Sequence, residues 1–183
     1  MRFTSITNHV RRRPRRRLSV GLATAVASVM LASGALAAPA LASSTFESNV
    51  TPLNTFYLQL DVSGASTQPG APVIDWYSNG GANQKWFFSQ VVAPGMYEIA
   101  NQNSGMCLTT DGNAGDQLYQ EPCNESTGQI WITNLSPSNS GYQSIQSAES
   151  GLYLDVYGNT SWPGASIDTW YWNGGSNQKW ALG

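Results

Sequence analysis

The sequence predicts an all-β fold built from three copies of one unit. The tripeptide Gln-x-Trp occurs three times, at Gln84-Lys85-Trp86, Gln129-Ile130-Trp131 and Gln178-Lys179-Trp180. Its tryptophans are 45 and 49 residues apart, a period typical of repeat architectures. Apolar and polar residues alternate in 57–62 and in 152–157, which is the pattern of half-buried strands. After Ala42 no stretch keeps the apolar period of an amphipathic helix, so we predict short strands joined by polar turns.

Residues 1–42 have the pattern of a cleavable secretory signal. Seven arginines come first, an Ala/Val/Leu/Gly-rich stretch follows from Leu18 to Leu36, and Ala40-Leu41-Ala42 offers the small residues of a cleavage site. The alternative is an uncleaved membrane anchor. Arg15-Arg16-Arg17-Leu18 partly matches a twin-arginine signal, so both export routes stay open. We expect a secreted, extracellular protein whose mature chain comprises residues 43–183.

The mature chain is strongly acidic. Its cations are Lys85 and Lys179, against eleven acidic residues, which leaves a net charge of −9. Such a surface cannot neutralise a run of phosphates, which argues against nucleic acid and anionic membranes as partners. His9 lies in the leader, so histidine-dependent catalytic and metal sites are excluded from the mature chain. The segment Asp111–Asp116 partly resembles a calcium loop, but it lacks the later bidentate glutamate and predicts a hairpin turn instead. We expect no metal and no cofactor.

The two cysteines, Cys107 and Cys123, are too few for a cysteine-only metal site. In an exported protein a disulfide is the expected state, with two free thiols as the alternative. A bond across their separation of 16 residues would stabilise the fold by about 3 kcal/mol.

The three repeats occupy about residues 46–90, 91–136 and 137–183. In the outer repeats an aspartate precedes the motif glutamine by 23 residues and a tryptophan precedes it by 8. These positions are Asp61, Trp76 and Gln84 in the first repeat and Asp155, Trp170 and Gln178 in the third. In the middle repeat Thr109 stands at the aspartate position, and Gly128 replaces the asparagine that precedes the outer glutamines.

This set of features resembles the ricin B-chain-type β-trefoil lectins, whose repeats carry an Asp-containing strand, an aromatic-bearing strand and a closing Gln-x-Trp. The resemblance covers about residues 46 to 183. It implies a barrel of six paired strands capped by three hairpins around a pseudo-threefold axis, with one shallow sugar pocket possible in each repeat. It also implies a binding protein and not an enzyme.

A site for a neutral sugar needs a carboxylate to accept hydroxyl protons, an amide for neighbouring hydroxyls and an aromatic ring under the C–H face. In the family the strand aspartate, the next strand's aromatic residue and the asparagine before Gln-x-Trp play those parts. Carried onto this chain, these are Asp61, Trp76 and Asn83 in the first repeat and Asp155, Trp170 and Asn177 in the third. The alternative to sugar contact is that Asp61 and Asp155 only cap turns.

Five further residues are weaker candidates for sugar contact: Asp75, Gln84, Asp168, Tyr171 and Gln178. Asp168 lies where the family often has a pocket glutamine, and Ile74 fills the corresponding place in the first repeat, with Asp75 one residue on. The glutamines are expected to bond local backbone first, because buried amides need partners. Tyr171, like Tyr77, either widens the stacking surface or pairs across strands.

Trp86, Trp131 and Trp180 are expected to fill the core, because burying an indole removes a large apolar area from water. Surface stacking on sugar is the alternative. The middle repeat is expected to bind no sugar, or to bind it weakly through Tyr119 and Gln120.

The sequence thus predicts a secreted lectin for neutral carbohydrate, in particular polysaccharide with galactose-, xylose- or arabinose-type units. One alternative is a trefoil scaffold for protein interaction or inhibition with relict sugar sites. A glycoside hydrolase is a further alternative, although the acids are scattered without a recognisable catalytic pair.

Overall fold

The computed structural model describes residues 45–138 and 141–183, and within these ranges the regular elements are strands and single-turn 3₁₀ helices. No helix of this part of the chain is long and apolar enough to cross a bilayer. The predicted signal and its cleavage site lie outside the described residues. The strands are β1 (Thr45–Ser48), β2 (Val50–Pro52), β3 (Leu58–Val62), β4 (Val73–Tyr77), β5 (Trp86–Gln90), β6 (Met96–Asn101), β7 (Cys107–Thr109), β8 (Tyr119–Glu121), β9 (Ile130–Thr133), β10 (Ile145–Ser147), β11 (Tyr153–Val156), β12 (Ile167–Trp170) and β13 (Trp180–Leu182). The 3₁₀ helices are η1 (Ser63–Ala65), η2 (Ala82–Gln84), η3 (Thr127–Gln129), η4 (Tyr157–Asn159) and η5 (Ser176–Gln178).

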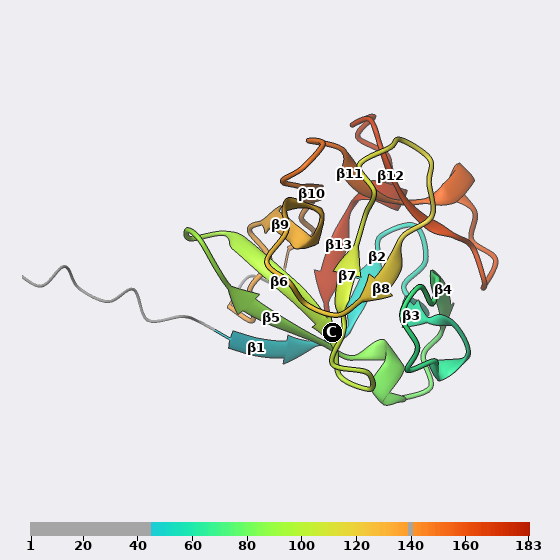
Figure 1. The fold of residues 1–183 in the computed structure, drawn as a ribbon. Helices are drawn as coiled ribbons and strands as arrows, with labels where there is room; N and C mark the ends of the chain where they lie inside the picture. The colour runs from blue at the N-terminus through green and yellow to red at the C-terminus, as the bar shows by residue number, and fades with distance from the viewer. Residues whose placement is uncertain (1–44, 139–140) are drawn as a thin grey trace, which may run out of the picture. The chain divides into compact units, whose positions relative to one another are not determined.

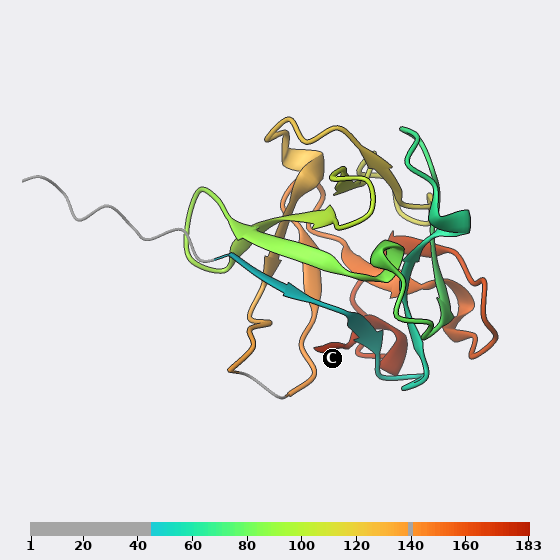
Figure 2. The same cartoon turned by 90° about the horizontal axis from the view of Figure 1, so that it is seen from below.

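A closed ring of antiparallel strands forms the body of the fold. Pairing runs from β1 to β5, β6, β9 and β10, and β13 pairs with β2, which continues β1 after a break at Asn49. The bridge between Gln143 and Trp180 joins the β10 side to β13 and closes the ring. In Figure 2 the neighbouring strands β1, β5 and β6 run side by side, coloured from blue to light green. Counting β1 and β2 as one position gives six barrel strands.

Three hairpins, β3–β4, β7–β8 and β11–β12, complete the fold (Figure 1). They meet one another through equivalent backbone positions. Val73 donates its N–H to the carbonyl of Leu118 at 2.9 Å, and Leu118 donates to the carbonyl of Ile167 at 2.8 Å. Each of these three residues belongs to a different repeat, so the hairpins pack around a pseudo-threefold axis. The described chain is all-β with the six-strand, three-hairpin arrangement of a β-trefoil.

The three motif tryptophans lie in the core, and each is fully buried. Burial stabilises the fold by about 25 cal/mol for each Å² of apolar surface removed from water. Their indole N–H groups donate to backbone carbonyls at 3.0 Å, from Trp86 to Leu60, from Trp131 to Leu108 and from Trp180 to Leu154. Each acceptor lies in the first strand of a hairpin. Each indole therefore ties a barrel strand to the hairpin of its own repeat, one residue before the position that carries Asp61, Thr109 or Asp155.

A disulfide between Cys107 and Cys123 closes the middle hairpin, which confirms the predicted pairing. The two Cα atoms are 5.0 Å apart. The bond links buried Cys107 at the start of β7 to exposed Cys123 just after β8. It therefore constrains the repeat that lacks the aspartate and asparagine of the outer repeats.

Replacing both cysteines, Cys107→Ser with Cys123→Ser, is expected to lower the free energy of unfolding by about 3 kcal/mol, the loop-closure contribution for this separation. Urea unfolding of the variant and of the parent protein under oxidising conditions would measure the difference. The parent protein in reductant is the control and should match the variant. Equal stability of the oxidised parent and the variant would show that the bond contributes nothing to the folded state.

Candidate functional site

The Asn-Gly-Gly-x-Asn-Gln segment of the first repeat forms a turn that holds Asn83 in place. The side-chain carbonyl of Asn79 accepts the N–H of Gly81 at 2.7 Å, and Gly80 has a left-handed φ of 72°. A Cβ on Gly81 would collide with Oδ1 of Asn83 and lie 2.7 Å from Oδ1 of Asn79. Gly81 is required by this close approach, whereas Gly80 is required by its backbone conformation. The third repeat has the same turn, with Gly175 donating to Asn173 at 2.7 Å.

The motif glutamines, Gln84 and Gln178, are fully buried and hold this turn in place by hydrogen bonds to its backbone. Gln84 donates to the carbonyl of Tyr77 at 2.9 Å and accepts the N–H of Asn79 at 2.9 Å. Gln178 repeats both bonds, to Tyr171 and from Asn173, at the same distances. Both glutamines were candidates for sugar contact. Because they are fully buried and bonded to backbone, they position the site and do not line it.

The two strand aspartates are held by the neighbouring asparagines. The amide of Asn83 donates to Oδ2 of Asp61 at 2.9 Å, and that of Asn177 donates to both oxygens of Asp155, at 2.8 and 2.9 Å. Gln84 also donates to Oδ2 of Asp61, at 2.7 Å. Burial raises the pKa of Asp61 and of Asp155, and the bonds from the glutamine and asparagine side chains act against this rise. Each carboxylate is thus oriented by amides at the pocket floor.

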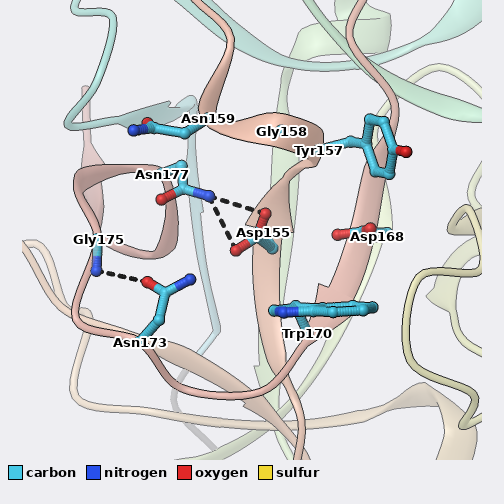
Figure 3. Close-up of a pocket in the computed structure, with 9 residues that line it drawn as sticks. All are labelled: Asp155, Tyr157, Gly158, Asn159, Asp168, Trp170, Asn173, Gly175 and Asn177. Atoms are coloured by element: carbon cyan, nitrogen blue, oxygen red, sulfur yellow. Dashed lines mark hydrogen bonds between the residues drawn. The ribbon is translucent and has the colours of Figure 1, made fainter.

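Each of these aspartates lines a cavity. The third-repeat cavity has a volume of about 430 Å³, and the first-repeat cavity about 370 Å³. In Figure 3 Asp155 lies at the centre of the larger one, with Asn177 on one side and Trp170 on the other. The third-repeat cavity is lined by Asp155, Tyr157, Gly158, Asn159, Asp168, Trp170, Asn173, Gly175 and Asn177. The first is lined by Asp61, Ser63, Gly64, Ala65, Ile74, Trp76, Asn79 and Asn83, which occupy equivalent positions.

The cavities differ at three equivalent positions. The third repeat has Tyr157, Asn159 and Asp168 where the first has Ser63, Ala65 and Ile74. The third cavity therefore offers an additional aromatic ring and two additional polar groups. The lining residues in η1 and η4 were missed by the sequence reasoning. The signal that could have found them is Gly64 and Gly158, each three residues after the strand aspartate, where both glycines have a left-handed φ.

Trp76 and Trp170 form the aromatic wall of the two cavities and are 41% and 43% exposed. Both are backed by a glycine from the neighbouring repeat. A Cβ on Gly164 would lie 3.4 Å from Cζ3 of Trp76, and one on Gly115 would lie 3.1 Å from Cζ3 of Trp170. The neighbouring hairpin thus supports each indole, and the exposed part of the ring remains available to the cavity. An exposed indole of this kind suits the C–H face of a sugar.

Asp168 faces the third cavity but is only 2% exposed. It lies opposite Asp155 in the β11–β12 pairing. Its Oδ1 atom is buried and has no hydrogen-bond partner among the described residues. Burial, and secondly the charge of Asp155, raises the pKa of Asp168 to about 7. The third cavity therefore has a carboxyl group that can donate a proton or accept one near neutral pH.

Asp75 does not reach the first cavity, which corrects its place among the sugar-contacting candidates. It is fully buried, and its Oδ1 accepts the N–H of Ala165 at 2.8 Å. Its backbone carbonyl accepts the N–H of Gly164 at 2.7 Å. Burial raises the pKa of Asp75 to about 6, against the effect of these backbone bonds. Asp75 therefore fastens the first hairpin to the third.

Tyr171 lies beside the third cavity and is not among its lining residues. Its ring is 66% exposed and meets Trp170 edge-on, with ring centroids 5.7 Å apart. In the first repeat Tyr77 meets Trp76 in the same way at 6.1 Å. Both tyrosines therefore extend an exposed aromatic surface outward from a cavity tryptophan.

The middle repeat has a cavity of about 570 Å³ with different chemistry. Thr109 is already bonded, because its hydroxyl donates to Cys107 and accepts from Gln129. A Cβ on Gly128 would lie 2.6 Å from Oε2 of Glu149, so the missing side chain leaves room for that carboxylate. Burial, followed by the charges of nearby acidic residues including Glu149, raises the pKa of Tyr119. The absence or weakness of sugar binding at this cavity stays a prediction.

Gln120 is not available to a ligand in the middle cavity. It is fully buried, donates to the carbonyls of Ser66 and Gln68 at 3.0 and 2.9 Å, and accepts from Ser104 at 2.7 Å. Gln120 therefore holds the surrounding backbone in place and does not line the cavity, contrary to its expected role in a weak site. Across residues 45–138 and 141–183, the loop 111–116 included, no cluster of three or more His, Cys, Asp or Glu side chains could hold a metal ion.

The comparisons with known proteins agree with this geometry. The family described as ricin-type beta-trefoil lectin domain-like matches residues 50–113, 82–170 and 127–183. The fold is similar to the designed threefold symmetric protein ThreeFoil, with a TM-score of 0.68, 28% identity, and coverage of 74% of this chain and 96% of that one. It is also similar to an exo-beta-1,3-galactanase from Clostridium thermocellum, with a TM-score of 0.67 and 29% identity. There the match covers 74% of this chain and only 29% of the galactanase chain.

A third similar structure is the C-half of an earthworm R-type lectin in complex with GalNAc. Its TM-score is 0.58 at 21% identity, covering 74% of this chain and 96% of that one, so it supports the fold alone. No curated protein matches the sequence. The family match spans the three repeats and all of the described cavities, so this chain belongs to the ricin-type β-trefoil lectin family.

Proposed function

We propose that this protein is a secreted lectin that binds neutral carbohydrate through the cavities of its first and third repeats, and that it is not an enzyme. The family supports a carbohydrate-binding role. The observation that carries the proposal is the recurrence of one constellation, a carboxylate, an asparagine amide and a half-exposed indole, at two equivalent cavities. Export would follow from the signal pattern of residues 1–42, with residues 43–183 as the mature domain.

The cavity chemistry favours a neutral sugar. Asp61 and Asp155 provide oxygens for hydroxyl protons, and their amide partners orient them. No lysine or arginine is among the residues that line either cavity, so an anionic group would meet no countercharge there. An aromatic wall matches the apolar face of a pyranose or furanose ring. These groups suit galactose-, xylose- or arabinose-type units.

A polysaccharide is the proposed target, because both cavities are shallow. A single sugar should bind each with a dissociation constant on the order of 0.1 to 1 mM, or about 4 to 5.5 kcal/mol. Two sites on one rigid domain gain affinity when one polymer occupies both.

A glycan array probed with the parent protein and with the Asp61→Ala/Asp155→Ala double variant tests the proposal. Binding to neutral glycans that is lost in the double variant supports it. Glycan-independent capture of a protein partner by both forms would favour an interaction scaffold instead. Release of reducing sugar from galactan, xylan or arabinan by the parent protein would show a glycoside hydrolase.

Substituting Gly175→Ala is expected to weaken sugar binding at the third cavity about tenfold, a change of about 1.4 kcal/mol. The new Cβ would collide with Oδ1 of Asn177, which would have to turn away from Asp155. Calorimetric titration with the sugar found on the array measures the effect. Gly81→Ala is the matched control and should weaken the first cavity alone. Unchanged binding in a folded Gly175→Ala protein would exclude this role for the glycine.

A further inference from the structure

Exposed aromatic rings continue outward from the first-repeat cavity. Trp76 meets Tyr77 with ring centroids 6.1 Å apart, Tyr77 meets Tyr57 at 6.2 Å, and Tyr57 meets Phe56 at 5.6 Å. These rings are 41%, 51%, 45% and 83% exposed, in the same order. We call Tyr77, Tyr57 and Phe56 the aromatic track. Contiguous exposed apolar surface of this kind marks interaction sites in soluble proteins.

A loop of the third repeat brings one more ring to this region. Asn54 donates to the carbonyl of Thr160 at 2.8 Å, and the hydroxyl of Tyr57 donates to the carbonyl of Ser161 at 3.3 Å. At its other end the loop is fixed by the bond from Gly164 to the carbonyl of Asp75 at 2.7 Å. Trp162 lies between these two anchor points and is 77% exposed. Its loop is thus held between the track residue Tyr57 and the cavity residue Trp76, against which Gly164 packs.

The fold itself does not require aromatic rings at Phe56, Tyr57 and Trp162. At the equivalent positions of the third repeat, Ser150 stands for Phe56 and Gly151 for Tyr57, and Gln68 of the first repeat stands for Trp162. The same hairpin therefore forms with small or polar residues at these places. Keeping large rings in water forgoes the stabilisation that their burial would bring. A ligand-binding role accounts for rings that packing does not need.

We propose that the aromatic track and Trp162 extend the first cavity into a groove for several consecutive units of a linear neutral polysaccharide. This inference rests on the proposed function and adds a ligand class to it. The track begins at Tyr77, which contacts the cavity residue Trp76, and the centroids of neighbouring rings are 5.6 to 6.2 Å apart. None of its residues carries a charge. Tyr77 and Tyr57 are stacked, whereas Trp76 and Phe56 meet their neighbours edge-on, and exposed aromatic rings can accept the C–H faces of sugars. The first repeat then binds the interior of a chain. The third cavity has Tyr171 but carries Ser150 and Gly151 in place of Phe56 and Tyr57, and it binds short units.

The test uses the Asp155→Ala protein, in which the first cavity is the remaining outer-repeat site. Galactose, xylose and arabinose and their linear hexasaccharides are titrated by calorimetry. With the track intact, the hexasaccharide of the sugar that binds should have an affinity at least about tenfold higher than the affinity of the corresponding monosaccharide. The triple change Phe56→Ser, Tyr57→Gly and Trp162→Gln installs the residue of the equivalent repeat position at each site. It should remove the gain with chain length and leave monosaccharide affinity unchanged.

Trp172→Ser, which installs the equivalent residue Ser78, is the matched control and should keep the gain. A second measurement, by nuclear magnetic resonance, uses the Asp155→Ala protein without substitutions in the track. The indole N–H resonance of Trp162 should shift with hexasaccharide and not with monosaccharide. The groove is overturned if chain length brings no gain while monosaccharides still bind, or if the triple variant keeps the gain. Concentration-dependent shifts of Trp162 without sugar would assign the track to self-association. No response to any saccharide would defeat the proposed function itself.

Discussion

The Asp155→Ala protein should lose sugar binding at the third cavity by at least about a hundredfold. The side chain supplies both oxygens that Asn177 holds in place, at 2.8 and 2.9 Å. Hydrogen bonds to a charged group contribute about 1.5 to 3 kcal/mol each, so losing two of them removes most of the binding free energy of a weak site. Titration followed by the indole resonance of Trp170 measures the loss at this site alone.

Asp61→Ala is the matched change in the first repeat and should abolish binding there while the third cavity keeps its affinity. Trp170→Ala should match Asp155→Ala at the third cavity, because the sugar then loses its stacking wall. Far-ultraviolet circular dichroism serves as the control for folding. If a folded Asp155→Ala protein bound the same sugar at the third cavity with parent affinity, the carboxylate would not be part of the site.

Stability should fall as pH rises from about 4 to 7, by up to about 4 kcal/mol from Asp168 alone. Burial raises the pKa of Asp168 from the ordinary 3.8 to about 7, so the folded state favours the protonated acid. This contribution is fully present below about pH 4 and is lost as the pH rises through the folded-state value. Asp75, with its pKa raised to about 6, adds a fall of the same sign.

Urea unfolding at several pH values for the parent protein and for Asp168→Asn measures this effect. The amide removes the titration of this side chain, so the variant should show a flatter dependence, with the remaining slope from Asp75, Asp61 and Asp155, whose pKa values are also raised by burial. Ile74 at the equivalent position of the first repeat shows that the hairpin accepts an uncharged residue there. Asp116→Asn, at an exposed aspartate, is the control. A parent protein whose stability rises between pH 4 and 7 would contradict the raised pKa.

The sequence predicted the strand content and the repeat plan well, because both depend on periodic signals. Alternation located β3 and β11, and the fixed spacing from aspartate to glutamine identified two equivalent units. The prediction for Asp75 was avoidable. Successive side chains of a strand point to opposite faces, so Ile74 and Trp76 facing the cavity already directed Asp75 away from it.

Contacts between repeats could not be predicted, because they depend on how the hairpins meet. Nothing in the spacing indicated that Gly164 would support Trp76 or that Gly115 would support Trp170. The Glu149 carboxylate beside Gly128 likewise comes from a different repeat. Single-sequence motifs describe each unit separately, whereas the cavity walls are shared.

That sharing makes the cavity walls of the first and third repeats structurally dependent on a neighbouring repeat. The rear of each outer pocket belongs to the preceding or following copy, so an excised unit would present an indole with nothing behind it. A substitution at Gly164 or Gly115 would then change the cavity of the neighbouring repeat and not that of its own repeat.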